Sequence, residues 1–440
     1  MMRHNRFLVA FITLMMAAFV VVFCTLPRSR YSELEKRDLL RFPDFSWQSL
    51  REGNFTQKVS NWFSDSEPFR DVLMRGSMEL KSQMAFKTKS AVTFHAAQEE
   101  PETTMVMDSL PKEVELGDQR VIEEFHNPVN ANAKMENAGV IVVGNSPSAR
   151  ALMAFKNKNK GEKPFAEVVN AYQKTFGSVA NVYCMIIPTA VEYYCPVNAE
   201  SCTDPEFPVL TELYSLIDSA VYVVDLYRVL GEHVDEDIYL RTDHHWAPLG
   251  AYYAARQFAL VADVEVPELV NFEADTIKNY VGSMYGFSKD VNVKKSPEDF
   301  VYYKPRGIEY TTTYRKYDLD EDFQIVGEEK PHQGDFFVKV SGSSSAYCTF
   351  MGSDARITQV KTASDCPRRL LVMKDSFGNA IPGYLFGSFE EVHVIDFRYF
   401  TYNIKDYVEE HSITDILIAN NISHVCSGAA GASYSKFLKK

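Results

Sequence analysis

Short apolar runs alternate with amphipathic stretches in two separate parts of the sequence, and this rhythm limits the possible folds more than any other feature. In a parallel sheet that helices cover on both faces, each strand is buried and reads as a nearly continuous apolar run. The segments between the runs, such as 163–176 and 208–220, carry apolar residues at helical spacing. The predicted strands are 139–143, 182–188, 221–226, 369–373, 391–396 and 415–420.

Both parts are therefore expected to belong to one α/β domain, a parallel sheet with covering helices, over residues 137–440. Between them, residues 271–367 are rich in Tyr, Thr, Ser and Asp and contain alternating pieces such as DFFVKV and DARITQVKT. Alternation of apolar and polar residues is typical of strands with one exposed face. This pattern predicts a β-containing insertion within the domain.

An unbroken apolar run of 20 residues, from Phe7 to Leu26, follows the basic opening MMRHNR. At helical rise, a run of this length matches the hydrocarbon core of a bilayer. By the positive-inside rule, Arg3 and Arg6 place the opening in the cytoplasm and the remainder of the chain outside the cell membrane. We expect residues 1–26 to form a cytoplasmic tip and a transmembrane anchor. A cleaved signal peptide is the alternative, although CTLP at the end of the run offers no good cleavage site.

Two segments separate this run from the α/β domain. Residues 27–95 place charges between apolar residues and predict a mostly helical stalk. From 96 to 136 the composition turns to Glu, Pro, Asn, Thr and Lys with little periodicity, which is typical of an exposed linker or insertion.

The overall composition excludes some classes of function. A formal net charge of −13 and a pI near 5.4 argue against a nucleic-acid binder, which normally presents a basic face. Of the seven cysteines, Cys24 lies in the apolar run, and none of the spacings matches a zinc site. Cys195 and Cys202 bracket a short loop, and they could either close a disulfide or remain as buried free thiols.

A serine follows one predicted strand, in the segment KDSFGNA. In open α/β sheets, chemistry sits at the carboxyl edge, where Ser376 would present its hydroxyl. The backbone N–H groups of Ser376 and Phe377 are the natural donors to an oxyanion there. Serine needs a base within hydrogen-bond reach, and that base needs an acceptor to orient it. Asp243 and His245, in TDHHW, can supply both, with the carboxylate holding Nδ1–H while Nε2 faces the serine.

Other interpretations of these motifs stay open. Ser146, in VVGNSPSAR, also follows a predicted strand and is either a rival nucleophile or a turn residue that caps the next segment. A metal ion held by Asp243, His244 and His245 is not expected. Adjacent histidines in a turn point apart, and no second cluster of ligands stands at a suitable spacing.

The TDHHW segment also suits an ordinary helix start, because Pro248 is well placed at the first helical position. That interpretation leaves the tryptophan and the paired histidines unexplained. We expect His244 to be a packed residue rather than the base. Trp246 could wall the site or stack on the face of a sugar.

TDHHW, the downstream KDSFGNA and HVIDFRYF, and the upstream SELEKRDLLRFPDFS and FSDSEPFRD together resemble the DHHW family of bacterial envelope proteins. More distantly, the chain is similar to SGNH-like acetyltransferases that O-acetylate alginate. The resemblance implies an SGNH-hydrolase-like sheet with Ser376 as nucleophile, His245 as base and Asp243 as its orienter. The serine comes last, the reverse of ordinary SGNH esterases, and a circular permutation of the sheet would explain that order. Lys374 departs from the familiar serine elbow, which has glycine there.

The resemblance also implies a function: a membrane-anchored, extracytoplasmic enzyme that moves acetyl groups onto hydroxyls of a cell-surface polysaccharide through an acyl-serine. A membrane-bound O-acyltransferase is the implied partner, and no cofactor is expected. The alternatives are a carbohydrate esterase and a catalytically inactive polysaccharide-binding or scaffold protein. Besides Phe377 and Trp246, the side chains that could bind substrate or an oxyanion are Asn379, Asn420, Asn421, Arg398 and Asp354.

Overall fold

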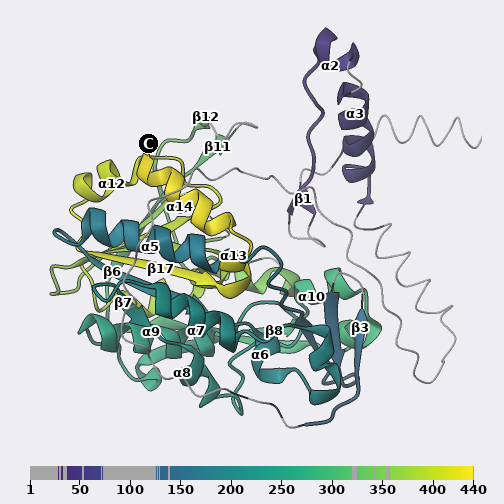
Figure 1. The fold of residues 1–440 in the computed structure, drawn as a ribbon, viewed down its shortest axis with the longest axis horizontal. Coiled ribbons are helices and arrows are strands. Elements are labelled where there is room, and N and C mark those ends of the chain that lie inside the picture. Colours follow the sequence, from purple (N-terminus) through teal and green to yellow (C-terminus); the bar gives the residue numbers. More distant parts are fainter. Residues whose placement is uncertain are drawn as a thin grey trace, which may run out of the picture. The chain divides into compact units, whose positions relative to one another are not determined.

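The chain divides into two units, Met1–Ala91 and Val92–Lys440, which are described separately (Figure 1). The computed structural model describes residues 28, 31–32, 37–51, 54–70, 72, 125, 127, 129–136, 139–319, 325–340, 342–352, 354 and 357–439. Within those residues no helix is long and apolar enough to cross a bilayer. The predicted anchor, residues 7–26, and most of the predicted linker lie outside them.

The first unit holds a short antiparallel pair, β1 (Tyr31–Ser32) and β2 (Arg37–Asp38), and two helices, α2 (Trp47–Arg51) and α3 (Asn54–Asp65). The Ser46 hydroxyl accepts the Ser49 N–H at 3.1 Å, which starts α2 as a side-chain cap. Phe55, Val59 and Trp62 recur at helical spacing along α3, so that one face of the helix is apolar.

The second unit is built on an eight-stranded sheet in the order β13-β10-β14-β16-β15-β17-β6-β7. The five strands from β16 to β7 are parallel, and β13, β10 and β14 extend the sheet antiparallel from β16. The predicted α/β fold with a mostly parallel sheet is confirmed. The strands are β6 (Asn181–Ile187), β7 (Tyr222–Val224), β10 (Tyr310–Arg315), β13 (His332–Gly334), β14 (Ile357–Thr362), β15 (Arg369–Lys374), β16 (Glu391–Asp396) and β17 (Asp415–Asn421).

The order of the parallel strands is that of a circularly permuted doubly wound sheet. If β15, β16 and β17 are numbered one to three and the count continues with β6 and β7, the spatial order is 2-1-3-4-5. This is the flavodoxin-like order, entered by the chain at its fourth strand. The carboxyl ends of β15 and β17 flank the point where the order reverses.

Burial of both sheet faces explains the apolar runs in the sequence. Every residue of β16 and β17 is buried, and so are all but the first residue of β15 and of β6. Figure 1 shows α5 (Glu162–Phe176) and α14 (Ala429–Lys439) on one side of strands β6 and β17, and α9 (Pro248–Ala262) on the other. The predicted start of a helix at Pro248 is confirmed.

The remaining helices are short connections around this sheet. The α-helices are α6 (Ala190–Tyr194), α7 (Phe207–Leu216), α8 (Tyr227–Gly231), α10 (Ser283–Ser288), α11 (Val291–Lys294), α12 (Ile404–Glu410) and α13 (Ile422–Cys426). The 3₁₀ segments are η2 (Val197–Cys202), η3 (Leu269–Asn271), η4 (Ser343–Thr349), η5 (Ser376–Ala380) and η6 (Pro382–Leu385).

Two details of the predicted topology are wrong. Residues 139–143 do not join the parallel sheet: β4 (Val140–Val143) pairs antiparallel with β3 (Ala133–Glu136) and β5 (Arg150–Met153) in a separate sheet. Its apolar side chains are buried there instead, so the apolar run alone could not tell the two sheets apart. Residues 133–136, placed in the predicted linker, are therefore part of a strand.

The predicted insertion, 271–367, is only partly separate from the sheet. β8 (Phe272–Tyr280) and β9 (Glu298–Pro305) form an antiparallel hairpin, and β11 (Tyr317–Leu319) pairs with β12 (Ile325–Glu328). The other three strands of this region, β10, β13 and β14, add to the central sheet at its β16 edge. All six cysteines in the described part of the chain are free thiols, Cys195 and Cys202 among them.

Candidate active site

Ser376 stands at the carboxyl edge of the central sheet, two residues after the last residue of β15. Asp375, the residue between β15 and η5, is in extended conformation, and its carboxylate accepts the Phe377 N–H at 2.9 Å. This side-chain turn starts η5, of which Ser376 is the first residue. The serine is half-buried and lies at the point where strand order reverses, the usual ligand position in an open α/β sheet.

His245 and Asp243 lie beside this serine, as predicted. The His245 Nε2 is 2.8 Å from the Ser376 Oγ, and its Nδ1 is 2.6 Å from the Asp243 Oδ1. The same carboxylate oxygen accepts the His245 backbone N–H at 3.1 Å. Carboxylate, imidazole and hydroxyl thus form one continuous hydrogen-bonded chain, in which His245 can take the serine proton and Asp243 can hold the imidazole in the required tautomer.

Further donors keep the buried Asp243 ionised. Its Oδ2 accepts the Tyr280 hydroxyl at 2.6 Å and the Ser283 N–H at 2.9 Å. Burial alone would raise the pKa of Asp243, but the charge and hydrogen bond of His245 and the bond from Tyr280 hold that pKa well below its usual range. Gly282 lies against the carboxylate so closely that a Cβ there would overlap Asp243.

A second carboxylate fixes the turn that carries the two histidines. Glu298, on β9, accepts the Arg241 N–H at 2.8 Å and both the N–H and the hydroxyl of Thr242, at 2.7 and 2.6 Å. Burial raises the pKa of Glu298. Tyr280 and Glu298 are cross-strand partners in the hairpin β8–β9, which therefore holds Asp243 and the neighbouring Thr242 of the TDHHW turn.

Trp246 and Tyr347 both hydrogen-bond to the serine loop. Trp246 is fully buried, and its Nε1–H donates to the Phe377 carbonyl at 2.9 Å. Tyr347 donates to the same carbonyl at 3.1 Å and stacks on the His245 ring, with centroids 3.9 Å apart and planes 6° from parallel. The expectation that Trp246 lines the site or stacks on a sugar is wrong, because no face of its ring is accessible.

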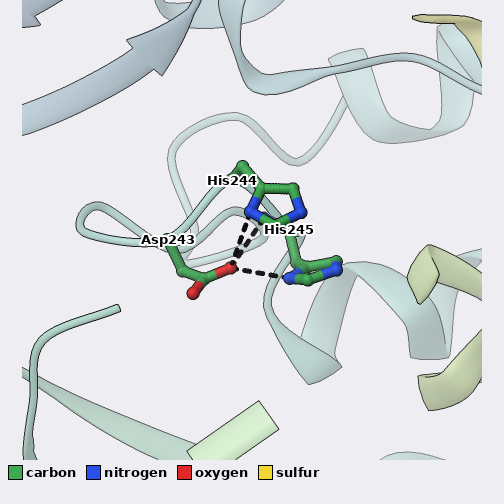
Figure 2. Close-up of side chains that lie close together, drawn as sticks. All are labelled: Asp243, His244 and His245. Carbon is green, nitrogen blue, oxygen red and sulfur yellow. Dashed lines mark hydrogen bonds and ion pairs between the residues drawn. The ribbon is translucent and has the colours of Figure 1, made fainter. Parts of the chain in front are cut away.

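His244 takes no part in the hydrogen-bonded chain to Ser376. Figure 2 shows its ring beside the Asp243 carboxylate, and it lies against the His245 ring with centroids 3.9 Å apart, so the two histidines do not point apart as expected. Its Nδ1 lies 2.6 Å from the Ser283 hydroxyl and 3.6 Å from the Asp243 Oδ1. Burial and the charge of His245 lower the pKa of His244 to about 3. The potential ligand atoms of the three residues lie within 4.8 Å of one another. Both ring nitrogens of His245 are already occupied by hydrogen bonds, so hydrogen bonding accounts for the cluster.

Asp375 ties the serine loop to the end of β17. Its Oδ2 accepts the Asn421 N–H at 2.7 Å, lies 3.0 Å from the His424 Nδ1, and receives a longer contact of 3.4 Å from the Asn420 amide. Burial alone would raise the pKa of Asp375, but the hydrogen bond and charge of His424 hold it below its usual range.

These contacts narrow the choice of oxyanion donors. The Phe377 N–H, predicted as a donor, already donates to Asp375. The Asn421 side chain caps α13 by accepting the His424 N–H at 3.1 Å, and the Asn420 side-chain oxygen accepts the Tyr434 hydroxyl at 2.8 Å. The Ser376 N–H donates to no acceptor within the described part of the chain, so it is the backbone group best placed for an oxyanion.

Comparison with known proteins agrees with the motifs. The profile of the DHHW protein family matches residues 112–395. A crystal structure of a DHHW family protein from Eubacterium siraeum is 34% identical, with a TM-score of 0.62, and the match covers 70% of this chain and 98% of that one. The chain belongs to the DHHW family. No match was found among curated proteins.

Two other solved structures resemble this DHHW chain at low identity. Bacillus cereus PatB1, solved with a sulfonyl adduct, is 18% identical with a TM-score of 0.50, and the match covers 67% of this chain and 97% of that one. The O-acetyltransferase domain of Pseudomonas putida AlgJ is 11% identical with a TM-score of 0.37, and the match covers 68% and 93%. At these identities only the fold is comparable, and the AlgJ score is too low to support an argument.

The predicted binding residues Asp354, Asn379 and Arg398 belong to a charge network next to the serine loop of the DHHW site. Buried Lys374 pairs with Asp396 at 2.8 Å and with Asp354 at 3.2 Å. Arg398 donates two hydrogen bonds to the Asp396 carboxylate and forms an ion pair with Asp354 at 2.9 Å. The Asn379 amide donates to Asp354 at 3.0 Å. Asp354 and Arg398 remain partly exposed, so they are the members of the network that a substrate can reach.

Lys374, which stands where the familiar serine elbow has glycine, is closely packed in this turn. Its stem packs against Gly378, where any Cβ would overlap the lysine side chain. Gly378 stands where the G-x-S-x-G elbow has its second glycine, so the close approach on that side of the serine is kept. The Lys374 ammonium group is neutralised by the network.

The rival nucleophile, Ser146, is exposed in the loop after β4, and its N–H lies 3.4 Å from the Asn292 side-chain oxygen. Within the described residues no imidazole contacts its hydroxyl.

A hollow of about 580 Å³ lies away from this site, between the end of α9 and the hairpin β8–β9. Neither Ser376 nor His245 nor Asp243 lines it. The sequence reasoning missed Tyr280, Glu298, Tyr347, Asp375 and His424.

Proposed function

We propose that this chain is an acyltransferase that works through an acyl-Ser376 intermediate, with acetyl as the transferred group. The observation that carries the proposal is the continuous chain from Asp243 through His245 to Ser376. His245 takes the proton as the Ser376 oxygen attacks the carbonyl of the donor ester, and it returns that proton to the leaving alcohol. The carbonyl oxygen becomes an oxyanion, for which the Ser376 N–H is available.

In the second half of the reaction, a hydroxyl of the acceptor replaces the leaving alcohol. His245 removes the proton from that hydroxyl, the new ester forms, and Ser376 recovers its proton. We assign the acceptor to a cell-surface polysaccharide, on the strength of the motif resemblance to envelope O-acetyltransferases. The partly exposed Arg398 and Asp354 are the polar groups proposed to contact it.

We further propose that residues 7–26 anchor the enzyme in the cell membrane, with the catalytic unit outside the cytoplasm. The support is the length and apolarity of that run and the basic residues before it. An acetyl donor would then have to reach the outer face of the membrane, and a membrane-bound O-acyltransferase is the proposed partner that delivers it.

An esterase and an inactive scaffold are the competing functions, and one experiment separates all three. The purified chain is incubated with p-nitrophenyl acetate, with and without cello-oligosaccharides, and the products are analysed by mass spectrometry. A transferase gives acetylated oligosaccharide and an esterase gives only acetate. A scaffold releases no more nitrophenol than Ser376→Ala does, and that result would overturn the proposal.

A further inference from the structure

The N-terminal unit carries a concentration of exposed apolar side chains that the catalytic proposal does not use. Five aromatic residues between positions 42 and 69 are between 47 and 72% exposed. Exposed aromatic groups in such number on so small a unit mark a surface that contacts something else. These residues are Phe42, Phe45, Trp47, Phe63 and Phe69.

Ring contacts join most of these residues into one strip along α3. The Phe42 ring lies 4.8 Å from Trp62 near the end of the helix and 6.2 Å from Phe55 near its start. Phe45 then connects Phe55, at 5.3 Å, to Trp47, at 5.2 Å. A twelve-residue helix is about 18 Å long, and the strip runs along it from Phe55 near its start to Trp62 near its end.

One end of the strip is fixed close to the apolar run of residues 7–26. The Arg28 guanidinium stacks on Trp62, 4.1 Å from the ring centroid, and donates to the Ser66 carbonyl at 3.0 Å. Arg28 is two positions after Leu26, and an extended chain covers at most about 7 Å in that distance. If the run spans the bilayer, the Trp62 end of α3 must therefore lie at the membrane surface.

Two arginines stand at the same end of the strip. A hollow of about 270 Å³ is bordered by Arg28 and Arg41 together with apolar side chains of Leu39, Leu40, Phe42 and Trp62. Arg41 is exposed. Guanidinium groups beside aromatic rings suit the interfacial layer of a bilayer, where phosphates lie next to the first carbons of the lipid chains.

We propose that the strip formed by Phe42, Phe45, Trp47, Phe55 and Trp62 lies flat on the outer surface of the membrane, with Arg28 and Arg41 at the lipid phosphates. The inference rests on the proposed membrane anchor and adds a second contact with the bilayer. The unit is then an interfacial membrane-binding element, whose aromatic rings are buried among lipid headgroups and upper acyl chains.

Tryptophan fluorescence tests this directly, because the chain has three tryptophans and Trp246 is fully buried in the catalytic unit. The full-length chain is reconstituted into phosphatidylcholine vesicles containing phosphatidylglycerol, with lipids brominated near the headgroup end of the acyl chains. We expect the bromine to quench the emission, and Trp47→Phe to remove a large part of that quenching. Phe42→Ser with Phe45→Ser should reduce the quenching by about half.

The control is Leu260→Ser, an equally exposed apolar residue of the catalytic unit, which should leave the quenching unchanged. Flotation with the vesicles after alkaline washing tests the anchor separately. A chain that fails to float refutes both the anchor and the strip. A chain that floats without quenching refutes only the strip, and so does quenching that Trp47→Phe leaves unaltered, since only the tethered end would then touch lipid.

Discussion

The His245 Nε2 lies 2.8 Å from the Ser376 hydroxyl although 131 residues separate the two in sequence. The strand order explains the meeting. His245 follows β7, the last strand of the permuted sheet, and Ser376 follows β15, its first. The loops after parallel strands open at the same edge of the sheet. The loop after the first strand and the loop after the last strand can therefore contribute residues to one site. The hydrogen bond from Trp246 to the Phe377 carbonyl joins the same two loops.

Tyr280→Phe should lower kcat/KM for p-nitrophenyl acetate by about ten-fold, since a hydrogen bond to a charged group is worth about 1.5 kcal/mol. The substitution removes the 2.6 Å bond to the Asp243 carboxylate and nothing else. Tyr302→Phe is the matched control, because it removes a tyrosine hydroxyl from the Asp275 carboxylate on the same hairpin, away from the site. Equal losses in the two variants would refute the role given to Tyr280.

Gly282→Ala should reduce turnover by about a hundred-fold, because displacement of a catalytic group by about 1 Å has effects of that size. A Cβ at this position would overlap the Asp243 side chain and push it from His245. Gly231→Ala serves as the control, since its Cβ would meet its nearest neighbour at an ordinary 3.7 Å. Retention of full activity by Gly282→Ala would show that the aspartate is less constrained than the contacts indicate.

Asp375→Asn and Asp415→Asn should have opposite profiles, although both carboxylates are buried on the same sheet. Asp375 sits at the carboxyl edge and orients the serine loop, so its loss should slow sulfonylation of Ser376 by about ten-fold. Asp415 sits at the opposite edge, paired with Arg368, and its loss should cost about 3 kcal/mol of unfolding free energy. The measurements are reaction with phenylmethylsulfonyl fluoride and urea denaturation. Slower labelling of Asp415→Asn than of Asp375→Asn would contradict the assignment.

The low pKa of His244 predicts a dependence of stability on pH. In the unfolded chain this imidazole binds its proton near pH 6.5, whereas in the folded chain it does so only near pH 3. Between these values the unfolded state holds more protons, so stability falls as pH falls. We expect His244→Gln to lose less unfolding free energy than the wild type between pH 6.5 and 5, measured by urea denaturation. The same slope in both proteins would mean that folding does not lower the pKa of His244.

The sequence was informative wherever a residue type or a position in a strand decides the geometry. Ser376, His245 and Asp243 could be placed because loops after parallel strands converge and because serine chemistry requires a base and an acceptor. The groups that orient them could not, since Tyr280 and Tyr347 come from the insertion and reach the site only through tertiary packing. Asp375 had a usable signal: an aspartate directly before a helix start is a typical cap.

Two of the errors in the prediction have a common origin. Burial makes a strand apolar whichever sheet it belongs to, so 139–143 looked like a strand of the central sheet. Trp246 was expected at the surface of the site for a similar reason. A ring next to the proposed catalytic residues in sequence can point either way, and here it points into the core, toward the Phe377 carbonyl.

The most direct test of the account is the location of a covalent adduct. The wild-type chain and the variants Ser376→Ala and Ser146→Ala are treated with p-nitrophenyl acetate, quenched in acid, digested and analysed by mass spectrometry. Acetyl should appear on Ser376 in the wild type and in Ser146→Ala, and the acetyl adduct should be absent from Ser376→Ala. An acetyl group on Ser146, or a label that survives in Ser376→Ala, would contradict the assignment of the nucleophile.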